Sequence, residues 1–204
     1  MIALTGNVDG FFQEVVGDAM RSRRIEASPA ATTYLVALLT DYTHPAREQE
    51  HLNRPLTLQL DEALQLGVPA ERFERLRSLG DTVLYAAGFF GEHFEARGVD
   101  ARYVHGIGTR AYGTAASMLR SGSSSRSVQD QAVQIDVFGE LASKFAGFVA
   151  VIEEIADITL TKSAAGPKGL LKLYERWQKT GSERLAQSLS EQGLVPMRGP
   201  KGVQ

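Results

Sequence analysis

VFGELASKFAGFVAVIEEI, at residues 137–155, is the stretch that decides the fold class of this chain. Its large apolar residues recur at intervals of three and four, which is the spacing of one face of an α-helix. They are Phe138, Leu141, Phe145, Phe148, Ile152 and Ile155. Neighbouring valines and Ile158 widen this face beyond a coiled-coil seam. The pattern therefore predicts a long, heptad-like central helix of a bundle, and a homodimer seam is the alternative.

Signals for the starts and ends of helices continue on both sides of this stretch. Ser28 with Pro29 is typical of a cap followed by a first-turn proline, and Pro69 opens a further helical segment that can bend near Gly80. Gly98 ends that segment and Asp100 can cap the next one. No segment alternates apolar and polar residues with period two between hairpin turns. The sequence predicts an all-α bundle of about seven to eight helices.

The length and composition favour one globular domain. The chain has 204 residues and 43% hydrophobic content, which is enough for one substantial core. We therefore expect a single helical domain over residues 1–204. Flexible connections are expected near residues 121–127 (SGSSSRS) and 163–169 (SAAGPKG), followed by a tail over residues 193–204.

Several features bear on the compartment. The chain lacks cysteine, which removes disulfides, thiolate zinc sites and cysteine nucleophiles and suits a reducing compartment. The N-terminal MIALTGNVDG has no basic region before an apolar core, so we do not expect it to act as a secretory signal. The longest apolar stretch, ASPAATTYLVALLT, has 14 residues, whereas a membrane-spanning helix needs about 20. We expect a cytoplasmic protein without a transmembrane segment.

Charge is distributed unevenly along the chain. From Thr161 onward, eight basic and three acidic residues give a net charge of +5, whereas the preceding residues, with 14 basic and 21 acidic, carry −7. Such asymmetry can mark a surface for an anionic partner. It can equally allow the basic tail to dock on acidic residues of its own chain.

Residues with catalytic or metal-binding potential do not form a recognisable set. The glycine-rich GIGTRAYG at residues 106–113 lacks the preceding strand that a dinucleotide loop needs. Glu48 and His51 have the spacing of one di-iron half-site, but such a site needs a second pair. The carboxylates of Glu153, Glu154 and Asp157 have no matched second group. We predict no catalytic residue, no metal site and no cofactor.

The segment after Pro167 predicts a basic amphipathic helix over residues 168–179. Its basic residues are spaced by four, four and three, so they share one face: Lys168, Lys172, Arg176 and Lys179. The other face is expected to carry Leu170, Leu171, Tyr174 and Trp177. This helix could bind nucleic acid, an acidic lipid surface or an acidic protein. Alternatively, its basic face is only solvated.

A second hypothesis concerns two successive helices, over residues 81–97 and 100–120. They concentrate aromatic and histidine side chains that could line a small-molecule site: Tyr85, Phe89, His93, Tyr103, His105 and Tyr112. Aromatic residues at helical spacing are also typical of a core. Glycines on the same helices, Gly88 with Gly91 and Gly106 with Gly113, predict that the two helices cross closely.

The two segments LYAAGFF and LYERW resemble parts of uncharacterised all-helical bacterial proteins, and the likeness extends over much of residues 30–196. The resemblance implies a bacterial, all-helical protein and carries no assigned activity. Together with the lack of a catalytic set, it leads us to expect a non-enzymatic interaction, adaptor or regulatory protein. Its partner would be another protein or a second copy of the chain.

Overall fold

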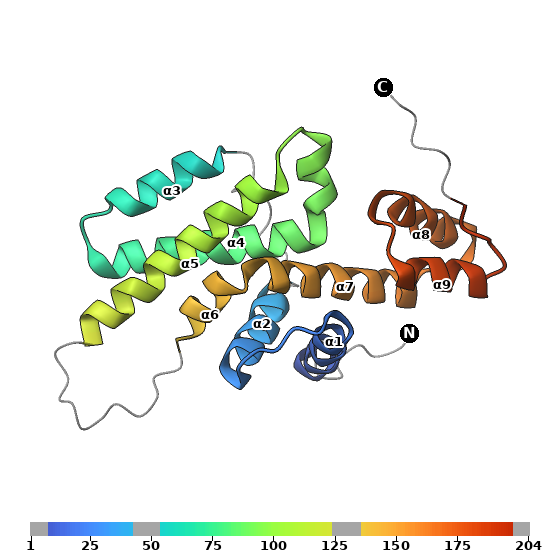
Figure 1. Ribbon diagram of the computed structural model, residues 1–204, viewed down its shortest axis with the longest axis horizontal. Coiled ribbons are helices and arrows are strands. Elements are labelled where there is room, and N and C mark those ends of the chain that lie inside the picture. Colours follow the sequence, from blue (N-terminus) through green and yellow to red (C-terminus); the bar gives the residue numbers. More distant parts are fainter. Residues whose placement is uncertain (1–7, 43–53, 124–135, 198–204) are drawn as a thin grey trace. The chain divides into compact units, whose positions relative to one another are not determined.

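The computed structural model describes residues 8–42, 54–123 and 136–197. Within these ranges the regular structure consists of nine helices, without a strand, so the all-α prediction is confirmed with one or two more helices than expected (Figure 1). The described ranges also contain no helix with the length and apolar character needed to cross a bilayer. The chain divides into two compact units, Met1–Ile152 and Glu153–Gln204, which are described separately; the single domain stays a prediction.

Local sequence signals set most of the helix ends. The helices are α1 Val8–Arg23, α2 Pro29–Asp41, α3 Leu56–Gln65, α4 Pro69–Ala96, α5 Ala101–Ser123, α6 Val137–Ser143, α7 Phe145–Ser163, α8 Gly166–Thr180 and α9 Glu183–Glu191. Ser28 caps α2 by accepting a hydrogen bond from the backbone N–H of Ala31 at 3.1 Å. Gly181 ends α8 with a φ of 66°, a left-handed conformation that favours glycine.

The heptad run of the sequence is a core face that is divided between α6 and α7. Lys144 separates the two helices with a φ of −110° and a ψ of 21°, outside the helical region. Its ammonium group donates hydrogen bonds to the Glu26 backbone oxygen at 2.7 Å and to Glu140 at 3.0 Å. Five residues of the run are buried and Phe138 is half-buried. The run therefore packs within the chain as a core face.

The bend of α4 lies at Phe90 rather than near Gly80. Phe90 has a φ of −127° and a ψ of 23°, whereas the helix continues without interruption through Gly80. A Cβ atom at position 80 would lie 2.6 Å from Cε1 of Tyr112 on α5. Glycine at position 80 therefore makes room for the tyrosine ring and does not act as a hinge.

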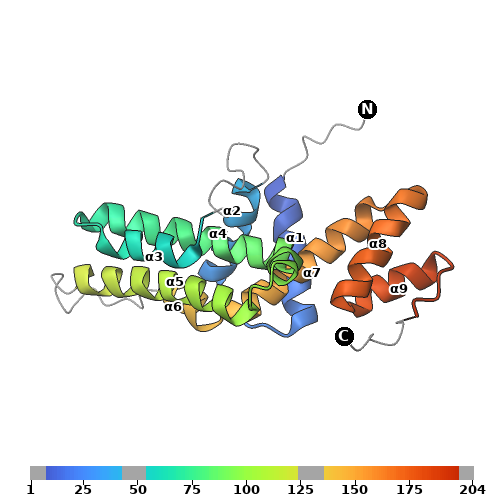
Figure 2. The same cartoon turned by 90° about the horizontal axis from the view of Figure 1, so that it is seen from above.

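The close packing of α4 involves different glycine partners from those predicted. Helices α3, α4 and α5 lie together in the first unit, with α4 and α5 in the most extensive contact (Figure 2). However, Gly88 faces the side chain of Ile152 on α7. Gly106 has open space around it, and Gly113 makes only an ordinary contact, 3.8 Å to Ala142. The predicted crossing through Gly88, Gly106 and Gly113 is therefore wrong, because two of these glycines face away from α4.

The second unit has a small core of its own. Its buried members come from α8 and α9: Leu173, Trp177, Leu185 and Leu189. Partly buried side chains, including Leu160 of α7, pack against them. Only Ala164 and Ala165 separate α7 from α8, so the connection predicted over residues 163–169 is shorter than expected. Most of the predicted connection at 121–127 lies outside the described residues, as does the tail beyond Met197.

Candidate functional site

The predicted small-molecule residues Tyr85 and Phe89 belong to an aromatic cluster beside the bend in α4. The ring of Tyr85 stacks on that of Tyr42, with 4.1 Å between centroids and 13° between planes. Phe89 and Phe90 lie 4.7 Å and 6.0 Å from the Tyr85 ring. The cluster is half-buried, with Phe90 exposed at its edge. Two of the six candidate residues therefore meet here.

Three other candidates lie outside this aromatic cluster, and two of them, Tyr112 and His105, lie beside the ring of Phe145. The ring of Tyr112 is fully buried between helices. Tyr103 is exposed, and its hydroxyl accepts a hydrogen bond from the backbone N–H of Thr57 at 3.3 Å. His105 is half-buried, 5.8 Å from the Phe145 ring. The side chain of the sixth candidate, His93, is outside those that the structure describes. The described candidates thus fall into three places: the aromatic cluster, the surroundings of Phe145, and the exposed position of Tyr103.

Burial of the His105 imidazole predicts a pH dependence of stability. Burial lowers the pKa of His105 from its ordinary value, because the cation loses hydration. The unfolded chain therefore binds more protons than the folded chain below about pH 6.5. The stability contributed by neutral His105 is complete above that pH, and it declines as the pH falls through the unfolded pKa toward the folded one.

We expect His105→Gln to reduce the slope of unfolding free energy against pH between about pH 7 and pH 5. Urea unfolding at a series of pH values measures this slope for the variant and the wild type. The other three histidines are shared by both proteins, so their contributions cancel in the comparison. Equal slopes would contradict a desolvated imidazole at this position.

A buried polar cluster, which sequence analysis missed, joins three helices of the first unit. Asp81 on α4 is 3% exposed. Its carboxylate accepts hydrogen bonds from the hydroxyls of Tyr34 on α2 at 2.6 Å and Tyr112 on α5 at 2.8 Å. Arg77, one turn earlier on α4, lies 3.4 Å from the second oxygen. We call these four residues the Asp81 cluster. A carboxylate within an otherwise apolar helix face is the one signal that could have revealed it.

The Asp81 cluster holds its two phenols in the neutral form. Burial, followed by the charge of Asp81, raises the pKa of Tyr34 and Tyr112 far above the ordinary value of a phenol. Both hydroxyls consequently act as hydrogen-bond donors at neutral pH rather than as bases or nucleophiles. The arrangement suits the joining of helices better than it suits acid–base chemistry.

In the second unit, two of the basic residues are paired with buried carboxylates. Arg176 of α8 bonds Asp157 of α7 through its Nε at 2.5 Å, with only 3% of the Asp157 side chain exposed. Arg184 of α9 bonds Glu154 of α7 in the same way at 2.5 Å. The basic tail thus docks in part on acidic residues of its own chain. Arg176 is committed to this pair, although the sequence placed it on the binding face.

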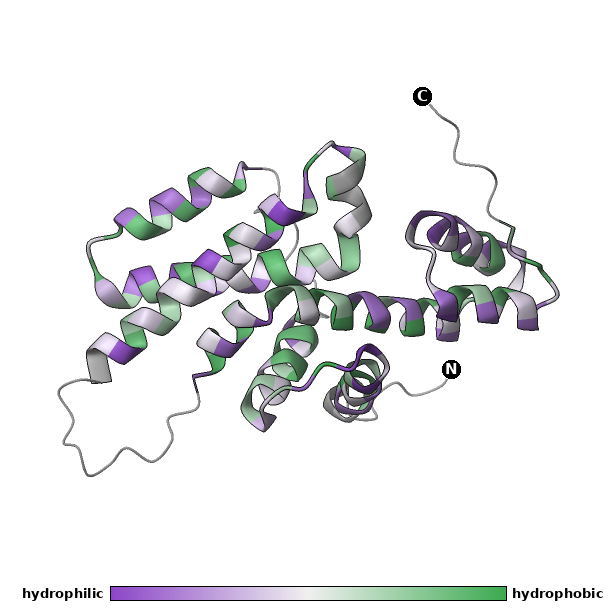
Figure 3. Cartoon of the chain, viewed as in Figure 1, coloured by the Kyte–Doolittle hydropathy of each residue, from purple (hydrophilic) through white to green (hydrophobic). Residues whose placement is uncertain are grey.

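The remaining basic residues of α8 lie on a solvent-facing stripe. It consists of Lys168, Leu171, Lys172, Glu175 and Lys179, which we call the α8 outer face. Figure 3 shows hydrophilic and hydrophobic residues alternating along α8. Leu171 is 56% exposed, and Leu173 occupies the core in its place. The expectation that Leu171 faces the core is wrong, because its position falls between two lysines of the stripe.

The other candidates from the sequence are carboxylates and one histidine. Glu48 and His51 lie outside the described residues. Within the part of the chain that is described, no three or more histidine, aspartate or glutamate side chains are grouped to hold a metal ion. Two of the α7 carboxylates considered for acid–base work, Glu154 and Asp157, instead bind arginines.

The chain was compared with protein families, curated proteins and solved structures. No protein-family model, no curated protein and no solved structure matches the chain. The likeness to uncharacterised bacterial helical proteins therefore rests on the quoted segments alone.

Proposed function

We propose that this chain is a non-enzymatic helical interaction protein that binds an acidic protein surface through the α8 outer face. The observation that carries the proposal is the presence of three exposed lysines around an exposed leucine. The opposite side of α8 is anchored by Trp177, which is 5% exposed, and the Arg176 pair with Asp157 holds the helix at the edge of the outer face. A helix that is anchored on one side and exposed on another suits docking, because little backbone order has to be gained on binding.

The mixture of residues favours a protein partner over a nucleic acid or a lipid surface. Glu175 lies within the stripe and would repel phosphate groups. The two arginines of this region that suit bidentate phosphate binding, Arg176 and Arg184, already bind carboxylates. One exposed leucine is too little apolar area for insertion into a membrane, but it fits a small apolar contact within a protein interface.

A small-molecule function has less support. Of the candidate residues whose side chains the structure describes, Tyr85 and Phe89 meet in the aromatic cluster, Tyr112 and His105 lie beside the Phe145 ring, and Tyr103 is exposed. Tyr112 is fully buried, and its hydroxyl donates a hydrogen bond to Asp81. We therefore prefer the interaction hypothesis.

The charge-reversal variant Lys168→Glu/Lys172→Glu tests the proposal. Arg176 is left unchanged, because its reversal would disrupt the Asp157 pair. We expect immobilised wild-type protein to retain at least one acidic protein from an extract of its source, with retention falling at high salt. The variant should lose that protein by about tenfold or more, as expected for the loss of charge pairs at an interface.

The matched control is Arg97→Glu/Arg110→Glu, which reverses two exposed charges in the first unit. It should retain the partner like the wild type. Purified heparin and phosphatidylserine vesicles are tested in parallel. Lysine-dependent binding to either would replace the protein partner with an anionic polymer or a membrane. Retention that is equal in all three proteins would remove the α8 outer face from consideration.

A further inference from the structure

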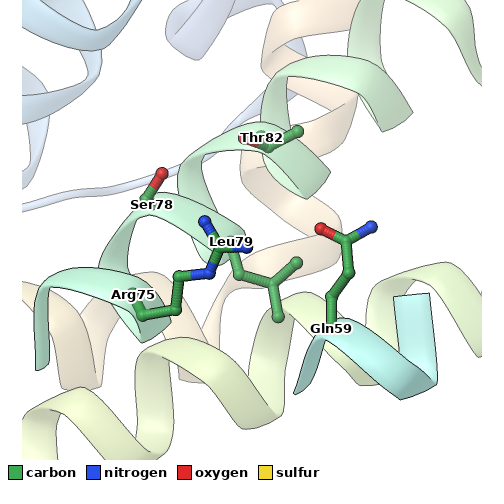
Figure 4. A pocket seen from close by; sticks show the side chains of 5 residues that line it. All are labelled: Gln59, Arg75, Ser78, Leu79 and Thr82. Atoms are coloured by element: carbon green, nitrogen blue, oxygen red, sulfur yellow. The ribbon is translucent and has the colours of Figure 1, made fainter. Parts of the chain in front are cut away.

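A small polar pocket lies between α3 and α4 in the first unit. It is lined by Gln59, Arg75, Ser78, Leu79 and Thr82. Figure 4 shows four polar side chains around Leu79, three of them from α4 and Gln59 from α3. The α4 residues are spaced by three, one and three, so they share a helix face. Arg75, Ser78 and Thr82 are half-buried, so the pocket opens to solvent.

Two of the four polar side chains in this pocket already form hydrogen bonds within the protein. Gln59 donates to the backbone oxygen of Arg54 at 3.2 Å, and Thr82 shares a hydrogen bond with the Tyr42 hydroxyl at 3.0 Å. By contrast, the described part of the chain contains no ion-pair or hydrogen-bond partner for the side chains of Arg75 and Ser78. A cationic fork and a hydroxyl therefore meet in one pocket with their donors available.

The nearby carboxylates of Glu74 and Asp81 are bonded to residues other than Arg75. Glu74 accepts two hydrogen bonds from Arg77, at 2.8 Å and 3.2 Å. The Asp81 carboxylate is enclosed by its own cluster. Arg72, another arginine of α4, donates instead to the Leu66 backbone oxygen at 2.8 Å. Arg75 is thus the arginine of this helix face that is positioned for an external acceptor.

From these contacts we infer that the pocket binds an oxyanion, a carboxylate or phosphate group, between Arg75 and Ser78. The planar guanidinium offers paired N–H donors that match the oxygens of either group, and the Ser78 hydroxyl supplies a neutral donor. The centre of a water molecule can move within about 10 Å³ of this pocket, so the pocket has room for one oxygen atom of a ligand. The rest of the ligand must therefore lie outside the pocket, so the site recognises a terminal oxyanion group.

Nuclear magnetic resonance titration with inorganic phosphate and with acetate, at constant ionic strength set by chloride, tests this inference. In the wild-type protein we expect saturable shifts of the backbone amides of Gln59, Ser78 and Thr82 with at least one of the two anions. Arg75→Gln should weaken the response about tenfold or more, because a charge-assisted hydrogen bond is lost. Ser78→Ala keeps the charge and should weaken it less.

The matched control is Arg110→Gln, which removes one exposed positive charge from α5 and should respond like the wild type. A response to phosphate alone or to acetate alone supports the site and identifies the preferred group. Shifts that do not saturate, or that are equal in Arg75→Gln, would overturn the inference and leave a pocket for an ordered water only. This outcome is independent of the α8 outer face, which lies in the other unit.

Discussion

Replacing Asp81 with alanine is expected to lower the free energy of unfolding by about 3–5 kcal/mol, the usual cost of removing one member of a buried charged network. The variant leaves the hydroxyl of Tyr112 fully buried without its acceptor, and Tyr34 loses its own at the same time. Arg77 also loses a carboxylate that lies 3.4 Å away. Each buried donor that is left unsatisfied adds to the cost of the substitution.

Urea unfolding followed by circular dichroism measures this loss. Asp81→Asn keeps a carbonyl acceptor but removes the charge, and it should cost less than the alanine variant. The control is Asp61→Ala on α3, where an exposed carboxylate accepts a hydrogen bond from Gln65 at 2.7 Å. That change should stay within about 0.5 kcal/mol. A loss below about 1 kcal/mol in Asp81→Ala would mean that the cluster does not hold the three helices together.

The variant Gly88→Leu should lower the free energy of unfolding by about 3 kcal/mol, at the upper end of typical overpacking effects. A Cβ atom at position 88 would approach the side chain of Ile152 more closely than 3.0 Å, which is nearer than real Cβ contacts occur. The nearest Ile152 atoms are its branched Cβ and Cγ2, which cannot swing aside like the end of a flexible chain. The helices would have to separate to admit the leucine.

The control for this variant is Gly106→Ala, which we expect to raise the free energy of unfolding. A Cβ atom at position 106 meets nothing within 4 Å, so alanine gains helix propensity of about 0.5–1 kcal/mol without a clash. Thermal and urea unfolding of both variants gives the comparison. If Gly88→Leu unfolded like the wild type, the close approach of α4 to Ile152 would be refuted.

Those parts of the fold that depend on residues close together in the sequence could be predicted from it. Ser28 with Pro29 begins α2, and Gly181 with Ser182 separates α8 from α9, because caps and left-handed glycines act over one helical turn. Apolar residues of α5 at helical spacing, including Val104 and Ala111, are buried. Local periodicity was sufficient for these elements.

Long-range partners were beyond this kind of prediction. Asp81 binds residues 47 positions before it and 31 after it, and nothing local indicates either distance. Gly88 was correctly expected at a close contact, but the partner is Ile152 and not the following helix. The break between α6 and α7 at Lys144 was not predicted either, because the spacing of apolar residues continues across it unchanged.

The candidate binding face was predicted in part. Lys168, Lys172 and Lys179 are exposed as their spacing indicated. Arg176 has the same spacing, yet it bonds Asp157, 19 positions earlier on another helix. Helical periodicity assigns a residue to a side of its helix, and it does not identify which charged residue of that side finds a buried carboxylate.

The Asp81 cluster also restricts how this sequence can change over evolutionary time. A substitution at Asp81 takes the shared acceptor from two tyrosine hydroxyls, and one at Tyr34 or Tyr112 removes a hydrogen-bond donor from the buried carboxylate, whereas simultaneous replacement by apolar residues of similar shape can be nearly neutral. The three positions should therefore be inherited together in descendants of the same ancestor. Aspartate at position 81 should accompany tyrosine at positions 34 and 112, and an apolar residue at position 81 should accompany phenylalanine or leucine at both.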